Sequence, residues 1–393
     1  MKVKKIIAFF LAACFLSLFT LAACDTKNEN NFYTELGIPS SEKHKQGVAS
    51  RCVWDMKVFD GGLFIGGGDY DKNTGPTDIW RYDLKKQEWG LSGTVEDEAV
   101  LRFVEINDTL IVPGTDPKEN WEFGNYYRFN GQSWDKVRNI DGGIHNFDMI
   151  KFGDKIFAGL GVNTDPELLF PLASPIACST DGGQNFEEVE LYKDGQPYRF
   201  RNKDIVVRTY EFLAFENTLY AVVRKILTQT DEETNVTETI EGENLVFRYE
   251  NDAFYYYSDF PSEIENAQPG VSMFNAKAEF KGKALFTTGY LYSTTDMKNY
   301  EKIAIGNLVV CDLLVENGVL YALCGIGSRQ TGYYTVSVYK NTTGLTDGFT
   351  EVFKFDYYAP AISFEKYGDD FYLGIGNRAK VFDHNGMVLK VNI

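Results

Sequence analysis

The chain has 393 residues, 39 of them basic and 56 acidic, which gives a formal net charge of −17 at pH 7. A surface of this sign repels phosphate backbones, so nucleic acid is excluded as an expected partner. The 30 Phe and 24 Tyr residues are of types enriched in strands, and no long helical period follows residue 24, so an all-β fold is predicted.

The first 24 residues combine a basic start with an apolar run. Three lysines lie within residues 1–5, residues 6–23 are largely apolar, and the chain turns polar directly after Cys24. This layout is typical of a secretory signal. Leu21-Ala22-Ala23-Cys24 resembles the lipobox of bacterial lipoproteins, which implies cleavage before Cys24 and a lipid on its sulfur. The same letters at 11–14 place Cys14 inside the apolar run, where a peptidase would not stop. An uncleaved signal anchor is the alternative.

Three segments follow from this interpretation. We expect a lipoprotein signal peptide over 1–23, a lipidated flexible tether over 24–47 and a folded domain over 48–393. Cleavage removes three lysines and leaves 36 basic against 56 acidic residues, a charge of −20. Anionic lipid repels such a chain, so the lipid on Cys24 is expected to hold the protein at the cell membrane, facing outside the cytoplasm.

A short hairpin pattern recurs seven times after residue 50. Each copy has a strand, a tight Asn, Asp or Gly turn and a second strand; the copies lie at 59–66, 106–112, 152–159, 215–221, 280–286, 315–322 and 367–374. A second hairpin follows each copy, the last at 381–388. Four antiparallel strands per repeat of about 51 residues are typical of propeller blades. We therefore predict a seven-bladed β-propeller of four-stranded antiparallel blades. Two stacked β-domains or sandwiches are the alternative.

One turn resembles a known propeller motif. Residues 179–186, Ser-Thr-Asp-Gly-Gly-Gln-Asn-Phe, are similar to the Asp-box, Ser-x-Asp-x-Gly-x-x-Trp, found between the third and fourth blade strands of sialidases and other propellers. The resemblance implies a structural role, in which Asp181 caps the backbone N–H groups of the turn and Phe186 anchors it. Residues 294–300 are a weaker copy, and the first repeat resembles a kelch repeat through Gly67-Gly68, Tyr82-Asp83 and Trp89.

Sialidase chemistry is the enzymatic alternative that the Asp-box resemblance brings. It would imply an arginine triad for the substrate carboxylate, and Arg51, Arg102 and Arg208 could reach the axis. However, their spacing does not demand a triad, and the Arg-Ile-Pro of that family is missing from the sequence. The three histidines, at 44, 145 and 384, lie far apart and predict neither a zinc site nor a Ser-His-Asp triad. Catalysis is therefore left uncertain, and binding without catalysis is preferred.

Charged residues occupy equivalent positions on the predicted inner strands. Counting four residues back from the apolar end of each first strand gives Asp55, Arg102, Asp148, Glu211, Ala276, Cys311 and Ser363. Burying an unpaired charge there is costly. Either the charges pair across blades, for example Arg102 with Asp55 or Asp148, or they line a hydrated axial ligand pocket.

The loops between second and third strands are long in the first four repeats, and in a propeller these loops share one face. They carry Asp116, Trp121, Phe123 and Asp165, and aromatic rings beside carboxylates suit sugar or peptide binding. Asp69, Asp71 and Asn73 resemble the start of a calcium loop, with an acidic solvated loop as the alternative. The acidic segment 228–243 is predicted to be a mobile insertion.

Two cysteines flank the turn Asn317-Gly318 symmetrically. In a two-residue hairpin, Cys311 and Cys324 fall opposite each other, so either a disulfide or two reduced thiols are expected. Cys52 and Cys178 lie in different repeats and are expected to be free.

The sequence as a whole predicts a monomeric cell-envelope lipoprotein that binds a glycan or protein ligand on the long-loop face of its propeller. No cofactor is required, although calcium is an option. The alternatives are a glycan-processing enzyme, such as a sialidase-like hydrolase or a lyase, and a structural assembly partner at the envelope.

Overall fold

The structure, a computed structural model, describes residues 32–40, 48–69, 72, 74–115, 123–143, 145–163, 174–199, 205–231, 236–264, 274–328, 330–345, 347–377 and 382–393. Cys24 lies outside these ranges. Strands dominate the described residues, and the 3-10 helices η1 (Val48–Arg51) and η3 (Ser262–Ile264) are short. Within these ranges, no helix has the length and apolar character needed to cross a bilayer.

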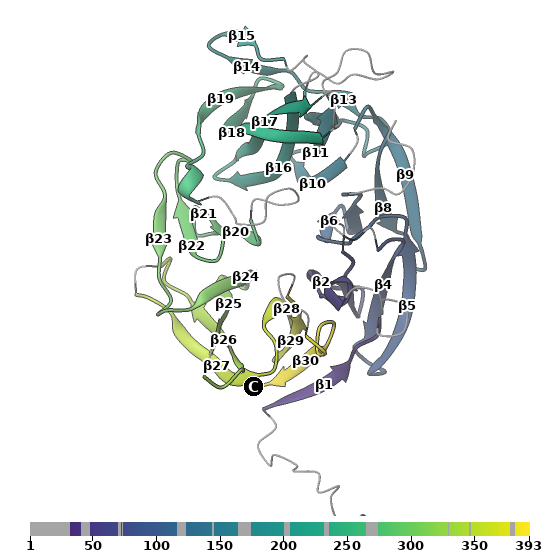
Figure 1. Ribbon diagram of the computed structural model, residues 1–393, viewed down its shortest axis with the longest axis vertical. Coiled ribbons are helices and arrows are strands. Elements are labelled where there is room, and N and C mark those ends of the chain that lie inside the picture. Colours follow the sequence, from purple (N-terminus) through teal and green to yellow (C-terminus); the bar gives the residue numbers. More distant parts are fainter. Residues whose placement is uncertain are drawn as a thin grey trace, which may run out of the picture.

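Antiparallel sheets surround one central axis, which is the architecture of a β-propeller (Figure 1). Five sheets are separate four-stranded blades. The first two repeats form β2 (Asp55–Phe59), β3 (Gly62–Gly66), β4 (Thr77–Asp83), β5 (Glu88–Val95), β6 (Val104–Ile106), β7 (Thr109–Pro113), β8 (Phe123–Phe129) and β9 (Trp134–Asp141). The last three repeats contribute β20 (Ala276–Phe280), β21 (Lys283–Thr287), β22 (Leu291–Thr294), β23 (Glu301–Ile303), β24 (Val309–Glu316), β25 (Val319–Gly327), β26 (Tyr334–Asn341), β27 (Thr350–Tyr357), β28 (Ala361–Tyr367), β29 (Asp370–Ile375) and β30 (Val388–Asn392).

The third and fourth repeats share one ten-stranded sheet. Its strands are β10 (His145–Phe152), β11 (Lys155–Asn163), β12 (Ile176–Ser179), β13 (Glu187–Glu188), β14 (Leu191–Lys193), β15 (Gln196–Pro197), β16 (Ile205–Phe215), β17 (Thr218–Asp231), β18 (Val236–Glu250) and β19 (Ala253–Asp259). Beyond the end of β12, β11 also pairs with β16, with Gly161 opposite Arg208. The prediction of seven separate blades is therefore wrong, because unusually long strands merge two repeats and leave five separate blades.

Part of the predicted mobile insertion belongs to these long strands. Thr228 pairs with Thr239 and Thr230 with Thr237, so β17 and β18 continue through most of segment 228–243. Threonine favours strands because its branched side chain fits the pleated surface. The described part of the segment is therefore strand, and the prediction of a mobile insertion is wrong there.

The start of the chain completes the last blade. β1 (Tyr33–Gly37) pairs with β30, and Figure 1 shows the two strands side by side below the axis. Two predictions are therefore wrong: residues 33–37 are a strand and not part of the tether, and the described residues 382–387 of the predicted last hairpin contain no strand. β1 supplies the fourth strand instead and covers an edge of β30 that would otherwise lack partners.

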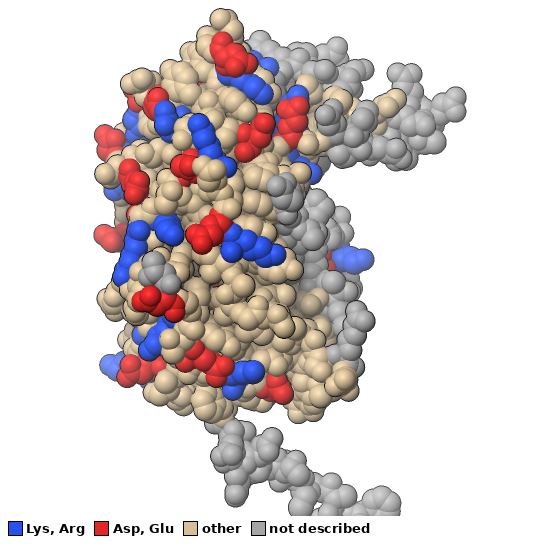
Figure 2. All heavy atoms as spheres, turned by 90° about the vertical axis from the view of Figure 1, so that its left-hand side faces the viewer, with Lys and Arg blue, Asp and Glu red and all other residues tan. Residues whose placement is uncertain are grey.

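Aromatic side chains fill the space around and between the sheets. In the fused sheet, the Phe157 ring lies 5.8 Å from that of Phe254 and 6.2 Å from that of Phe212. In the fifth repeat, Phe274 stacks on Phe286 at 4.3 Å. These rings are fully buried, which accounts for the large aromatic content. On the outer surface, acidic and basic side chains are interspersed over the side shown in Figure 2.

The antiparallel order gives the propeller two distinct faces. Connections from second to third strands, and from each fourth strand to the next first strand, lie on one face, here called the loop face. The tight turns within the two hairpins of each repeat lie on the other, here called the hairpin face. Each first strand begins at the loop face and lies nearest the axis (Figure 1).

Candidate functional site

An axial cavity of about 330 Å³ lies among the inner strands. It is lined from five repeats by residues 54–57, 101–103, 275–278, 312–315, 364 and 365. Six of its lining residues are charged: Lys57, Arg102, Lys277, Asp55, Asp312 and Glu365. Most of these residues lie at or just before the first residues of the inner strands. The cavity therefore lies toward the loop face.

Two cations of the wall cover two buried carboxylates. Arg102 Nη1 lies 2.9 Å from Asp148 Oδ1, and Arg102 Nη2 lies 2.9 Å from Glu211 Oε1. Lys277 Nζ contacts both carboxylates as well, at 3.2 Å from Glu211 Oε2. Asp148 and Glu211 are 1% and 0% exposed, whereas Arg102 and Lys277 keep 18% and 21% exposure. These four residues, called the quartet below, balance their charges.

The contacts of the quartet favour the charged forms of Asp148 and Arg102. Burial acts to raise the pKa of Asp148, but Lys277 and Arg102 outweigh it and hold this pKa below its usual value. Burial acts in the opposite sense on Arg102, where Glu211 and Asp148 raise the pKa of the guanidinium. These contacts therefore favour the ionised forms of both Asp148 and Arg102.

A second balanced pair closes the ring between the last and first repeats. Lys57 Nζ lies 3.2 Å from Glu365 Oε1, and Ser363 Oγ donates to the Val53 carbonyl at 2.7 Å. Burial raises the pKa of Glu365 to about 7, although Lys57 opposes this effect. The pair therefore joins β2 to β28 beside the cavity.

Aspartates on three inner strands bind the backbone of the following repeat. Asp55 accepts a hydrogen bond from the Phe103 N–H at 2.6 Å. In the same way, Asp148 accepts from the Phe212 N–H and Asp312 accepts from the Phe364 N–H, both at 2.8 Å. Asp55 and Asp312 also accept the N–H of the residue that follows each of them. The same carboxylate geometry thus links repeats one to two, three to four and six to seven.

Asp55 and Asp312 differ from the other charged residues in their partners. Among the described residues, no ion pair joins either carboxylate to a cation, and backbone N–H groups are the hydrogen-bond partners found for them. Burial raises the pKa of Asp55 and, together with the nearby Asp55 charge, raises that of Asp312 well above its usual value. Neither carboxylate therefore forms an ion pair within the described residues, although the charges of Lys57 and Arg102 partly offset the effect of burial on the pKa of Asp55.

The structure brings the four predicted axial residues, Asp55, Arg102, Asp148 and Glu211, to one region. The expected pairing of Arg102 with Asp148 forms, and Arg102 and Asp55 also line the cavity. Ligand binding there stays a prediction. Sequence reasoning missed Lys57, Lys277, Asp312 and Glu365. Asp312 was missed because the count in this repeat started at Val315. The strand in fact ends at Glu316, which pairs with Val319 across the turn, and four residues before Glu316 is Asp312.

A β-bulge explains the wrong assignment at Cys311. The register shifts between Val310 and Asp312, so Cys324 pairs with Val310 and Cys311 has no direct partner. The predicted opposition of Cys311 and Cys324 is therefore wrong, and both are free thiols, as are Cys52 and Cys178. Burial raises the pKa of the Cys311 thiol to about 12, so it stays protonated.

Most of the loop residues predicted to bind ligands fall outside the described ranges. These are Asp71, Asn73, Asp116, Trp121 and Asp165; Phe123 begins β8, but its side chain is likewise not described. Asp69 is buried, and its carbonyl accepts the N–H groups of Lys72 and Thr74 in a turn. Within the described ranges, no three His, Cys, Asp or Glu residues group as metal ligands, and calcium at 69–73 stays a prediction.

Exposed apolar side chains gather on the loop face of the last three repeats. They are Tyr290, Val309, Ile326, Tyr333 and Tyr358, called the loop-face patch below. Val309 pairs with Gly325 next to Ile326, and the Tyr333 ring lies 5.2 Å from that of Tyr358. His384 stacks on Tyr358 at 4.8 Å with an interplanar angle of 14°. The patch thus follows the edge of one blade and reaches the next, and sequence reasoning missed it because its members are scattered along the chain.

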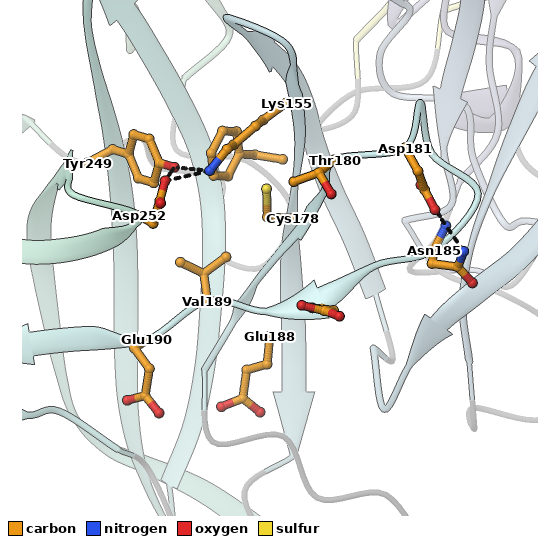
Figure 3. Close-up of a pocket in the computed structure, with 12 residues that line it drawn as sticks. Lys155, Cys178, Thr180, Asp181, Asn185, Glu188, Val189, Glu190, Tyr249 and Asp252 are labelled. Atoms are coloured by element: carbon orange, nitrogen blue, oxygen red, sulfur yellow. Dashed lines mark hydrogen bonds and ion pairs between the residues drawn. The ribbon is translucent and has the colours of Figure 1, made fainter.

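A larger cavity of about 500 Å³ lies at the outer side of the fused sheet, beside the predicted Asp-box turn (Figure 3). Asp181 Oδ1 accepts the N–H groups of Gln184 and Asn185, each at 3.0 Å, as expected for a turn cap. Across the cavity, Lys155 donates to Tyr249 and Asp252 (Figure 3). These polar groups bind one another, so their contacts indicate a structural role. The resemblance to the Asp-box family itself stays a prediction.

Comparisons with known proteins give structural likenesses only. No family model and no curated protein matches the chain. Among solved structures, it is similar to YCF48 from Cyanidioschyzon merolae, at 11% identity and a TM-score of 0.45 over 92% of this chain and 98% of that chain. It is also similar to the N-terminal domain of Nup159, at 7% identity and a TM-score of 0.40 over 68% of this chain and 72% of that chain.

Proposed function

We propose that this protein is a binding propeller of the cell envelope, anchored by lipid on Cys24, which binds a glycan on its loop face without transforming it. The observation that carries the proposal is the loop-face patch. Monomeric proteins rarely expose apolar side chains in contiguous groups, and such groups often mark binding surfaces. Here the group lies on the face where the loops converge.

The chemistry of the patch suits a sugar ring. An aromatic ring has a negative face, which attracts the positively polarised C–H bonds on one face of a pyranose. Tyr333 and Tyr358 supply such rings. The exposed carboxylate of Asp356 lies two residues before Tyr358. A carboxylate can accept hydrogen bonds from the sugar hydroxyls. Stacking and hydrogen bonding would therefore act together.

The contacts of the arginines support binding over sialidase-like hydrolysis. Arg102 is engaged by Asp148 and Glu211. Arg208 donates to the Tyr210 hydroxyl, and Arg51 donates to the Asp383 carbonyl. These separate contacts do not provide the shared site that a substrate carboxylate would need.

A glycan array probed with the mature chain tests the binding proposal. Tyr358→Ala should weaken binding about fivefold or more, as the loss of a central aromatic contact does. Tyr367→Ala is the matched control, because both tyrosines are 49% exposed but Tyr367 ends β28 on the hairpin face. Equal effects of the two substitutions, or no glycan binding at all, would refute the proposal. Capture of a defined envelope protein that Tyr358→Ala abolishes would favour the protein-partner alternative.

The anchor has its own test. Metabolic labelling with an alkyne analogue of palmitate should label the wild-type chain and the Cys14→Ser variant. It should not label Cys24→Ser, which lacks the lipidated sulfur. Label retained by Cys24→Ser would show that the lipid attachment is wrongly assigned.

A further inference from the structure

Among the described residues, two carboxylates of the axial cavity form no ion pair with a cation. The quartet pairs two cations with two carboxylates, and Lys57 pairs with Glu365. Asp55 and Asp312 remain, each held by two backbone N–H groups. A carboxylate has about four sites for hydrogen-bond donors. Each therefore keeps acceptor capacity beyond the two backbone bonds.

We propose that the axial cavity binds a small molecule through a primary ammonium group held between Asp55 and Asp312. This site is separate from the loop-face patch, and it does not depend on glycan binding. The cavity of about 330 Å³ falls within the range of about 300 to 1,000 Å³ for small-molecule sites. An ammonium group brings three donors and one positive charge, which match the two carboxylates.

Other ligand classes fit the cavity less well. An anion would meet the two carboxylates directly, and the nearby cations are already held by Asp148, Glu211 and Glu365. A hard metal ion such as calcium takes six to eight oxygen ligands. Within the described ranges, no three His, Cys, Asp or Glu side chains lie close enough together to hold a metal ion. An ammonium group needs only the two acceptors present.

Proton release should accompany binding. Asp312 shares the cavity with Asp55 and Lys57 from β2, Arg102 before β6, Lys277 from β20 and Glu365 from β28. Burial and the charge of Asp55 raise the pKa of Asp312 well above its usual value, so the empty site holds a proton at this pair more readily than an ordinary aspartate does. An ammonium ion favours the ionised pair and displaces that proton. Affinity should therefore increase as the pH rises from about 5 to 8, a range in which the amine itself stays protonated.

Isothermal titration calorimetry on the mature chain can compare three probes of equal length. We expect 1,5-diaminopentane to bind at pH 7.5, and pentane-1,5-diol and glutarate to bind at least about tenfold more weakly, because a charged hydrogen bond contributes about 1.5 kcal/mol or more. Titrations in buffers of different ionisation enthalpy should show proton release for the diamine. Equal binding of the diol, tighter binding of glutarate, or no binding of any probe would overturn the proposal.

Variants locate the binding site. Asp55→Asn and Asp312→Asn should each weaken diamine binding about tenfold. Asp154→Asn, on an exposed turn of the hairpin face, and Tyr358→Ala, in the loop-face patch, should not change it. If the axial variants fail to fold, the proton release of the wild-type chain still decides the question. Calcium binding that Asp312→Asn abolishes, without diamine binding, would make the cavity a metal site and overturn the proposal.

Discussion

Arg102 contacts two carboxylates that are almost fully shielded from solvent, Asp148 and Glu211. Taking these ions out of water has a high desolvation cost, which only close contacts between opposite charges can offset. Lys277 contributes the second positive charge, so the quartet is balanced only when both cations are present. Removing one cation leaves an uncompensated negative charge at the centre of the propeller.

The substitution Arg102→Met tests this interpretation. It keeps a long apolar side chain but removes the charge, and we expect the free energy of unfolding to fall by about 3–5 kcal/mol, as for other broken buried pairs. Urea denaturation followed by tryptophan fluorescence measures the change. Arg248→Met is the control, because its ion pair with Glu250 is exposed and should contribute about 1 kcal/mol or less. Similar losses for the two variants would contradict the assigned role of the quartet.

At the scale of single residues, the sequence predicted the pairing of Arg102 with Asp148 but not its environment. Position counting found Arg102, Asp148 and Glu211 because their repeats have tight two-residue turns. It missed Lys277 because Ala276 holds the counted position in that repeat. Whether a neighbouring side chain reaches the axis depends on the packing of the blades around it, which a linear pattern does not contain.

At the scale of elements, β-bulges decide which side chains face the axis. Register shifts occur just before Asp148, Glu211, Asp312 and Ser363 on their inner strands. Each bulge inserts one residue and re-aims those beyond it. At β24 the bulged residue is Cys311, which has no direct partner on β25, and Asp312 directly after it reaches the Phe364 N–H. A bulge does not alter the alternation on either side of it, so hydrophobic periodicity alone could not reveal it.

The hairpin pattern predicted the inner strands of all seven repeats but not how the sheets divide. Strands β17 and β18 have 14 and 15 residues, far more than a blade requires. Their length, together with the pairing of β11 with β16, merges two repeats into one sheet. Sheet boundaries depend on where neighbouring edges meet in space, so similar local patterns gave five separate blades and one fused sheet.

At the scale of the whole molecule, the ring is closed by strands from the two ends of the chain. Tyr33 of β1 packs against Phe355 at 4.8 Å and Tyr357 at 5.5 Å. The Trp89 Nε1–H of the first repeat donates to the Leu36 carbonyl at 2.8 Å. β1 thus covers the edge of β30 and also contacts the neighbouring repeat. Residues 33–37 were assigned to the tether because five residues in a polar region give too little signal, and their partner strand is more than 350 residues away.

Truncation tests whether β1 closes the propeller. A chain of residues 38–393 should lose about 2–4 kcal/mol of unfolding free energy relative to residues 31–393, because it loses the partly buried Tyr33 and Leu36 side chains and a strand of backbone pairing. Both chains lack Cys24, so the lipid does not enter the comparison. The shorter chain also exposes β30 as an open edge, which can pair with another copy, so size-exclusion chromatography should show self-association. If the 38–393 chain stays monomeric and unfolds at the same urea concentration, the remaining strands close the ring without β1. That result would contradict this role of β1.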